Sequence, residues 1–316
     1  MSQITRRDFL QLAGAATGSV AILAAGCSSQ PTATTTTARF QPVTPQAGAT
    51  YLSVAHGSDP ASITRAAILA VGGIERFVRP GQDVIIKPNI CTDYHPPEYA
   101  ATTNPDVVAE IVRLCLGAGA KRVRVMDTPI SSTSDAAYTV SGIAAAVKAA
   151  GGEMEVMSPL KYTSVPIPLG KDLTEWKIYR DILETNVLIN VPIAKHHSLA
   201  RLTLGMKNLL GVVDRPNQIH QNLGQRVAEL ASVIRPTLTV IDAYRILLDH
   251  GPTGGSLNDV KQTNTVIASQ DMVSADAYGT TLFGLTAADI AYIKDASALG
   301  LGTMDLNAIK IEEINV

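Results

Sequence analysis

The sequence predicts an α/β fold with a mostly parallel sheet and helices on both faces. Residues 153–180 are the region at which the domain could be split into two lobes. Three observations support the fold class. Strand-like and helix-like segments alternate along the chain. The segment 187–191 is apolar except for one Asn, as expected of a strand covered on both faces. Polar residues follow directly after several strands, where open α/β sheets place their ligands.

The chain divides into three segments by composition. Residues 1–27 hold Thr5-Arg6-Arg7-Asp8-Phe9-Leu10, then an apolar run to Gly26, then Cys27. The paired arginines resemble a twin-arginine export signal. Residues 23–27 resemble a lipobox, although Leu23 stands four residues before Cys27 instead of three. Cleavage elsewhere, without lipidation, is the alternative.

Residues 28–50 are rich in Thr and Pro and are predicted to be a disordered tether. Residues 51–316 are predicted to be the folded domain.

The composition of the 316-residue chain limits its partners and cofactors. Its formal net charge is −2, which gives no reason to expect nucleic acid binding. Outside the leader only Cys91 and Cys115 remain, too few thiolates for a typical cluster or Cys-only zinc site. We therefore expect no iron–sulfur cluster, and no disulfide except a single Cys91–Cys115 pair; any other cofactor is left unidentified.

The order of elements follows from apolar periodicity and from turn residues. Pro105 is typical of a first helical turn, with Thr103 or Asn104 as its cap, and Asp271 is expected to cap a later helix. A small antiparallel insert is expected within 153–180, with short strands at 153–157 and 164–167. The predicted strands are 51–55, 83–87, 122–126, 187–191, 238–241, 264–269 and 308–316. The predicted helices are 59–78, 105–116, 136–150, 179–184, 222–234, 272–283 and one that begins at 286 and ends before Gly300.

The segment 187–215 organises the prediction. Its strand ends at Pro192, and basic residues follow with Asp214 as the only acid between Thr185 and Ala228. Cations without local counter-charge repel one another unless an anion lies among them. A solvated basic helix face is the plain alternative, but apolar residues and glycines interrupt the segment.

An ordered set of motifs resembles the DUF362 family, a domain of unknown function, over about residues 50–316. The motifs are Lys87-Pro88-Asn89, Thr103-Asn104-Pro105, Asp127, Lys195-His196, Met206-Lys207-Asn208-Leu209-Leu210-Gly211, Asp242, Gly251-Pro252 with Gly254-Gly255, and Asp271 with Ala275-Asp276. Many members of that family carry a ferredoxin-like module, which this sequence lacks. More loosely, the layout is similar to lactate racemase-type proteins.

We expect a site for a small carboxylate or phosphate, in an enzyme, at these strand ends. Lys195, His196 and Lys207 are the candidate catalytic residues, since lysines hold anions as point charges and imidazole titrates near neutrality. The expected ligand-binding residues are Lys87, Asn89, Thr103, Asp127, His197, Asn208, Asp242, Gly251, Gly254 and Gly255.

Two other interpretations stay open. A metal-dependent or racemase-like enzyme would use oxygen and nitrogen ligands from His196, His197, His220, Asp127 and Asp242. A solute-binding lipoprotein would hold the same anion without turnover. Cys91, beside Lys87-Pro88-Asn89, is a weaker candidate for a nucleophile.

In each case we expect an exported protein that uses the twin-arginine machinery. It would be periplasmic or attached to the outer face of the cytoplasmic membrane, with Cys27 as its only membrane attachment.

Overall fold

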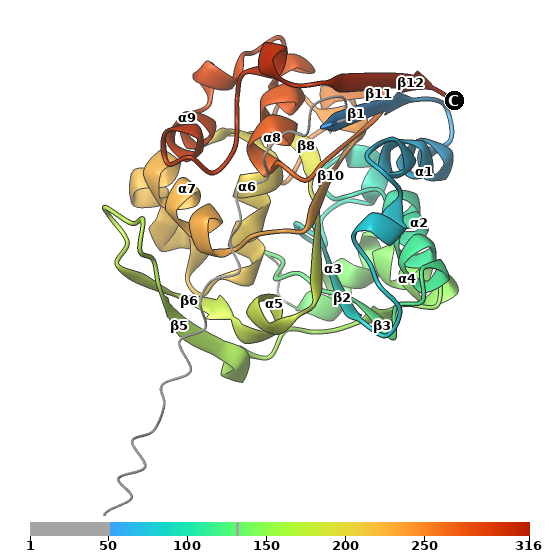
Figure 1. Ribbon diagram of the computed structural model, residues 1–316, viewed down its shortest axis with the longest axis horizontal. Coiled ribbons are helices and arrows are strands. Elements are labelled where there is room, and N and C mark those ends of the chain that lie inside the picture. The colour runs from blue at the N-terminus through green and yellow to red at the C-terminus, as the bar shows by residue number, and fades with distance from the viewer. Residues whose placement is uncertain (1–50, 131–132) are drawn as a thin grey trace, which may run out of the picture. The chain divides into compact units, whose positions relative to one another are not determined.

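A mixed, mostly parallel ten-stranded sheet crosses the domain (Figure 1). The computed structural model describes residues 51–130 and 133–316. The expected leader 1–27, with Cys27, and the tether 28–50 lie outside the described residues. The order across the sheet is β12-β1-β11-β10-β7-β2-β3-β4, with β8 beside β10 and β9 beside β8. The predicted fold class is confirmed.

The strands differ in direction between the two halves of the sheet. From β10 through β7, β2 and β3 to β4 all neighbours are parallel, whereas β11 is antiparallel to both β1 and β10. The strands are β1 (Leu52–His56), β2 (Asp83–Pro88), β3 (Arg122–Val125), β4 (Glu153–Met154), β7 (Val187–Val191), β8 (Ile193–His197), β9 (Arg201–Thr203), β10 (Leu238–Leu247), β11 (Val260–Ser269) and β12 (Ile311–Asn315).

Helices cover both faces of the sheet, as Figure 1 shows for α1, α2 and α4 on one side and α6, α7, α8 and α9 on the other. Two buried apolar clusters fill the spaces between helices and sheet, one on each face. The helices are α1 (Pro60–Ala70), α2 (Pro105–Gly117), α3 (Ser134–Val140), α4 (Ile143–Ala149), α5 (Arg180–Glu184), α6 (Gly205–Asn208), α7 (Leu223–Val233), α8 (Met272–Thr281) and α9 (Ala291–Ala298).

Glycine shortens two of the predicted helices. The predicted helix 59–78 ends at Ala70, because Gly72 and Gly73 take φ values of +108° and +78°. The predicted helix 136–150 is two helices, α3 and α4, separated at Gly142 with φ +72°. Both breaks place a left-handed residue where only glycine is unstrained.

The expected antiparallel insert in 153–180 is a hairpin of β5 (Tyr162–Pro166) and β6 (Glu175–Tyr179). The strand expected at 153–157 is not part of it, because β4 pairs with β3 in the main sheet. The apolar side chains of the hairpin pack against one of the two main clusters. The described residues belong to one compact unit, so the hairpin does not create a second lobe.

The basic segment after β7 differs from the prediction. Lys195, His196 and His197 belong to β8, which resumes beyond Pro192 and pairs with both β10 and β9. Asp242 is likewise inside a strand, because β10 continues to Leu247 across an irregularity between Ala243 and Arg245. Local sequence shows where an apolar run is interrupted, but sheet pairing carries the strand past the interruption.

The short helix α6 depends on a distant carboxylate for its first turn. Buried Asp276 of α8 accepts the backbone N–H groups of Gly205 (2.6 Å) and Met206 (2.9 Å). These two donors have no partner within the helix itself. Asp276 therefore fixes the helix that carries Lys207 and Asn208.

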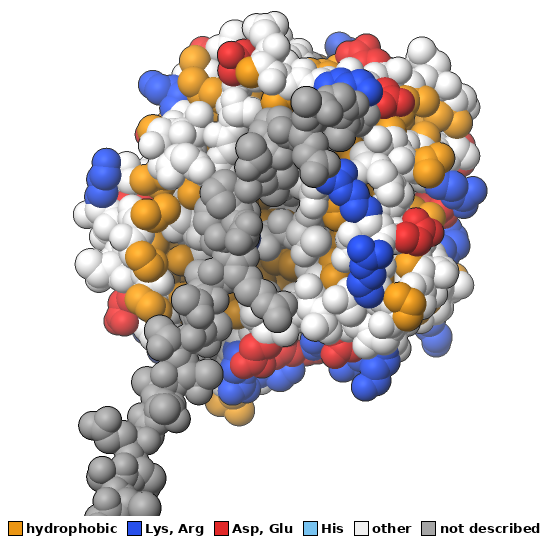
Figure 2. All heavy atoms as spheres, viewed as in Figure 1, with side chains coloured by type: hydrophobic (Ala, Val, Ile, Leu, Met, Phe, Trp, Pro, Cys, Tyr) orange, Lys and Arg blue, Asp and Glu red, His pale blue; other side chains and the backbone are white. Residues whose placement is uncertain are grey.

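Charged side chains are spread around the domain. On the face seen in Figure 2, Lys and Arg alternate with Asp and Glu around the rim, with apolar side chains between them. Across the described residues, none of the helices combines the length and the apolar character that a membrane span requires.

Candidate functional site

Buried polar side chains gather at the carboxyl ends of β2, β3 and β7. Lys87 and Asn190 are register neighbours on β2 and β7, and Asp127 follows β3. The strands β2 and β7 are neighbours in the sheet. The strand that pairs with β2 on its other side is β3, whereas the strand that pairs with β7 on its other side is β10, so the strand order changes direction between β2 and β7. Open α/β sheets bind ligands outside such a point.

Lys87 and Asp127 form a buried ion pair. Their Nζ–Oδ1 distance is 2.8 Å, and the side chains are 2% and 4% exposed. Burial lowers the pKa of Lys87 and raises the pKa of Asp127, while their mutual attraction opposes both shifts. Asp127 also accepts the N–H groups of Ile90 (2.7 Å) and Thr128 (2.9 Å). The positive charge of Lys87 is thus already compensated inside the protein.

Asn208 links the two parallel strands through its side-chain amide. Its Oδ1 accepts from Lys87 Nζ (2.8 Å) and Asn89 Nδ2 (2.9 Å). Its Nδ2 donates to Asn190 Oδ1 (2.8 Å), and Asn190 in turn donates to the carbonyl of Gly205 (2.9 Å). These bonds orient the first turn of α6 against the sheet.

Lys195 is held by neutral acceptors. Its Nζ donates to Asn89 Oδ1 (2.9 Å), to the carbonyl of Pro252 (2.8 Å) and to the carbonyl of Ala101. An ammonium has three donors, so all of them are satisfied by the protein. Burial lowers the pKa of Lys195.

Lys207 differs from the other two lysines. It is 8% exposed, yet its ammonium has no hydrogen-bond acceptor and no ion-pair partner among the described residues. Burial, followed by the positive charge of Lys195, lowers the pKa of Lys207 to about 7. An amine with this pKa exists as cation and as free base in comparable amounts at neutral pH, which suits both anion binding and proton transfer.

Two histidines lie near Lys207. The Nδ1 atom of His197 accepts the N–H groups of Leu199 (3.1 Å) and Ala200 (3.3 Å), so the neutral ring carries its proton on Nε2. Burial and the charge of Lys207 lower the pKa of His197 to about 3. The ring of His220 lies 5.8 Å from that of His197, and its Nε2 is buried without a hydrogen-bond partner.

His196 lies apart from this group. Neighbouring residues of a strand point to opposite faces, and the side chain of His196 is 30% exposed whereas Lys195 and His197 are buried. The Nδ1 atom of His196 accepts the N–H of Gly251 (3.1 Å). Its position favours a contact with the glycine loop over a shared role with Lys207.

Thr103 and Asp242 hold the start of α2. The hydroxyl of Thr103 donates to the carbonyl of Val191 and accepts the N–H of Asn89, both at 2.8 Å. Asp242 accepts the N–H groups of Asn104 (2.7 Å) and Tyr244 (3.0 Å). Burial raises the pKa of Asp242 to about 6. Both side chains thus serve backbone groups around the site.

The glycine motif at residues 251–255 is a loop that reaches the site through Pro252, whose carbonyl accepts a hydrogen bond from Lys195. Gly251 lies against β8, where an added Cβ would lie 1.8 Å from the carbonyl oxygen of His196. Gly254 has φ +81°, and Gly255 packs against His250. These glycines allow the loop to lie close to β8.

Several residues of the cluster carried weak or no signal in the sequence. Cys91 lies beside Lys195, and its thiol donates to Pro252 O (3.4 Å). Asn190 is a single polar residue in a buried strand. Gly211 lies against the ion pair, where an added Cβ would lie 2.0 Å from Asp127 Oδ1. A polar residue inside an apolar strand is the one pattern that pointed to Asn190 beforehand.

The acidic and imidazole side chains considered as metal ligands do not converge. Within residues 51–130 and 133–316, no group of three or more His, Cys, Asp or Glu residues could hold a metal ion. Asp127 faces Lys87, and Asp242 faces backbone amides. Cys91 and Cys115 are both free thiols, so the single disulfide left open by the sequence is not formed.

Comparison with known proteins gives a family match and a distant relative. The model of the domain of unknown function DUF362 matches residues 84–281, well over half of the chain. A protein of Synechocystis sp. named thylakoid-associated protein sll1697 is 27% identical over 246 residues, which cover 73% of this chain and 72% of that one.

Two solved structures resemble the chain at low sequence identity. The lactate racemase apoprotein of Thermoanaerobacterium thermosaccharolyticum aligns with a TM-score of 0.47 and 13% identity over 72% of this chain. A protein of Thermotoga maritima aligns with a TM-score of 0.44 and 12% identity over 72% of this chain. The alignments span 56% and 60% of the lengths of those two proteins.

The first prediction concerns the space around the ion pair. Gly211→Ala would place a methyl group against Asp127 and Lys87 and should separate them, which costs about 3 kcal/mol of unfolding free energy. Urea denaturation measures it. Gly117→Ala is the matched control, because its Cβ meets no atom within 4 Å and it should be neutral or slightly stabilising. Equal effects of the two changes would contradict the assigned packing.

The second prediction concerns the charge of Lys207. Its folded pKa of about 7 lies below the ordinary lysine value of 10.5, so the unfolded chain binds more protons between these two pH values. The contribution of Lys207 to stability should therefore rise with pH in that window, by up to about 1.4 kcal/mol per pH unit. The difference in unfolding free energy between wild type and Lys207→Met, measured in urea from pH 7 to pH 10, reports it. For the exposed Lys148→Met control, the difference in unfolding free energy from wild type should not change with pH. If the difference for Lys207→Met is equally constant, the lowered pKa of Lys207 is refuted.

Proposed function

This chain belongs to the DUF362 family, a domain of unknown function, and we propose that it is an enzyme that binds a small carboxylate or phosphate at Lys207. One observation carries the proposal. Lys207 is a largely buried lysine whose ammonium has no protein acceptor among the described residues, and its Nζ is not among the atoms closed off from solvent. A largely buried charge without a protein partner is costly, and an anionic ligand that reaches Nζ from the solvent would supply the partner.

The surroundings of Lys207 support an anion over a cation. Lys195 and Lys87 both lower its pKa through their positive charge. The neutral ring of His197 carries its proton on Nε2, for which no acceptor is found among residues 51–130 and 133–316. Asn89 and Asn208 hold the two other lysines in place. The ligand would thus meet the ammonium of Lys207 and the imidazole N–H of His197. Behind them lie Lys87 and Lys195, whose positions are fixed by hydrogen bonds.

For catalysis, the pKa of Lys207 is the useful property. As a free base it would accept a proton from the bound substrate, and as a cation it would stabilise negative charge that develops there. Lys195 and His196, the other expected catalytic residues, would then position the carbonyl of Pro252 and the loop at Gly251. This assignment concentrates the chemistry on one lysine.

The second candidate function is capture of the same anion without turnover. The contacts of Lys87 and Lys195 favour it. Both ammonium groups already have their partners, so the walls of the site need little rearrangement when an anion binds. Retention of an unaltered ligand would separate it from the enzyme.

The anion-binding test uses acetate, malonate and inorganic phosphate as probes in thermal-shift and calorimetric titrations. We expect at least one of them to bind, with an affinity that falls up to tenfold per pH unit above pH 7 as Lys207 loses its proton. Lys207→Met should abolish binding, and Lys148→Met should leave it intact. Binding that survives Lys207→Met would refute the site; conversion of a bound compound, followed by NMR, distinguishes enzyme from binder.

We also propose that the protein is exported through the twin-arginine route and attached to the membrane by a lipid on Cys27. The leader motif and the thylakoid association stated in the name of the Synechocystis relative support this. Attachment by lipid would leave the folded domain at the outer face of the cytoplasmic membrane.

The attachment is tested by cell fractionation. Wild-type protein should sediment with membranes and resist carbonate extraction, whereas Cys27→Ser should remain unprocessed at the lipobox. Arg6→Lys with Arg7→Lys should retain the protein in the cytoplasm. A wild-type protein recovered wholly in the soluble periplasmic fraction would contradict lipidation.

A further inference from the structure

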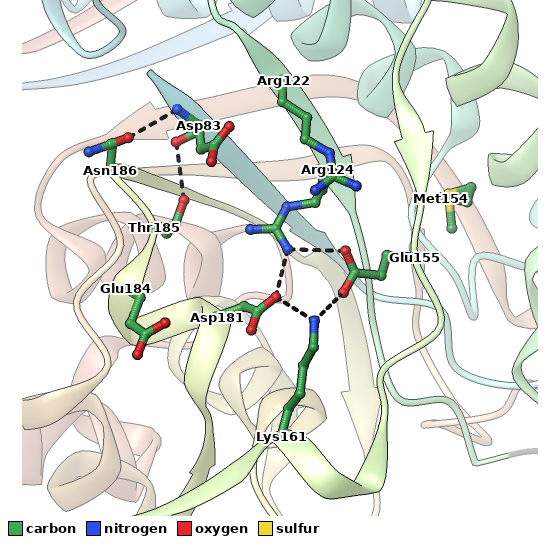
Figure 3. A pocket seen from close by; sticks show the side chains of 10 residues that line it. All are labelled: Asp83, Arg122, Arg124, Met154, Glu155, Lys161, Asp181, Glu184, Thr185 and Asn186. Atoms are coloured by element: carbon green, nitrogen blue, oxygen red, sulfur yellow. Dashed lines mark hydrogen bonds and ion pairs between the residues drawn. The ribbon is translucent and has the colours of Figure 1, made fainter. Parts of the chain in front are cut away.

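A polar pocket lies at the opposite end of the parallel strands from Lys207, near the amino ends of β2, β3 and β7. Figure 3 shows the ten side chains that line it. Asp83 begins β2, Arg122 and Arg124 belong to β3, and Asn186 directly precedes β7. The pocket shares no lining residue with the Lys207 cluster, so inferences about the two sites are independent.

One side of the pocket is a closed ion-pair network. Nη1 of Arg124 contacts Glu155 Oε2 (3.0 Å) and Asp181 Oδ2 (2.7 Å). Lys161 Nζ contacts the same two carboxylates at 3.1 and 2.9 Å. Two positive and two negative groups therefore neutralise each other (Figure 3).

Arg124 uses only one of its nitrogens in this network. Its side chain is 9% exposed, and its Nε is buried without a hydrogen-bond partner. Nε and Nη2 form the side-on edge of a guanidinium, which matches the two oxygens of a carboxylate. The neighbouring Arg122 shows this edge paired with a carboxylate, because its Nε and Nη2 both donate to Glu153 (2.8 and 2.6 Å).

The other side of the pocket carries uncompensated negative charge. Asp83 and Glu184 line it, and their carboxylates have no ion-pair partner in the described part of the chain. In Figure 3 the guanidinium of Arg124 lies between the ion-pair network and the group formed by Asp83 and Thr185. A ligand with a carboxylate alone would form two hydrogen bonds with the Nε–Nη2 edge of Arg124, here called its fork, but the negative charges of Asp83 and Glu184 would repel it.

We infer that this pocket binds a free amino acid or a similar small zwitterion. Its carboxylate pairs with the Nε–Nη2 edge of Arg124, and its ammonium faces Asp83 and Glu184. The ligand would give the Nε–Nη2 edge of Arg124 a partner, and its ammonium would offset the charge of one of the two acids. The side chain of the ligand would extend toward Thr185 and Asn186 or into solvent.

The test uses calorimetric titration of the full mature chain with the proteinogenic amino acids, one at a time. The titrations are made with the Lys207→Met variant, which lacks the anion site and so separates the two sites. At least one amino acid should bind with a millimolar or lower Kd, whereas acetate and methylamine, its two halves, should bind at least about tenfold more weakly. Absence of binding by every amino acid, or equal binding of acetate to this variant, would overturn the inference.

Three variants identify the residues. Arg124→Lys retains a positive charge for Glu155 and Asp181 but loses the fork, and should weaken binding about tenfold or more. Asp83→Asn with Glu184→Gln leaves the network intact and should remove the preference for a zwitterion over acetate. Arg113→Lys, which lies on α2 outside the pocket and pairs with Glu110, is the control and should bind normally. Urea unfolding of each variant checks that it folds; binding unchanged in folded Arg124→Lys would refute the fork.

Discussion

The burial of three lysines at the carboxyl ends of the central strands is the constraint on which the site depends. Each ammonium removed from water needs a partner. Lys87 takes a carboxylate, Asp127, and Lys195 takes neutral oxygens from three segments. These requirements bring together β2, the segment after β3, β8 and the loop at Pro252. Lys207 is the lysine whose requirement the described residues leave open.

The supporting structure around the lysines is built from neutral amides and backbone contacts. Asn208 bridges β2 and β7 through Lys87 and Asn190, and Asp276 holds the start of the helix that carries it. Glycines at 205, 211 and 251 permit these approaches, because a Cβ at each would meet a neighbouring atom within 2.7 Å. A change at any of them would therefore act on the charges they adjoin. The motif Met-Lys-Asn-Leu-Leu-Gly combines one lysine without an acceptor in the described part of the chain, one bridging amide and one such glycine.

The two edges of the sheet offer different chemistry. At the carboxyl ends of the strands, three lysines face a single paired carboxylate, Asp127, which favours an anionic ligand. At the amino ends, the closed ion-pair network leaves the Nε–Nη2 edge of Arg124 and two acids unpaired among the described residues, which favours a zwitterion. Both arguments rest on polar groups that have no partner among residues 51–130 and 133–316, the ammonium of Lys207 at one end and Nε of Arg124 at the other. They assign separate ligands to separate residues.

Sequence alone determined the α/β class, the order of most elements and the identity of the polar residues near the central strands. Periodicity, Pro105 and the Asp271 cap were sufficient, since these signals act over a few neighbouring residues. Tertiary structure decided which residues are free to act. Lys87, Lys195 and Lys207 look alike in the sequence, and only the contacts of each ammonium distinguish them. Likewise, pairing with β9 and β10 makes a strand of the segment after Pro192 that holds His196 and His197. Hydrogen bonding between distant segments, which no local pattern encodes, made these decisions.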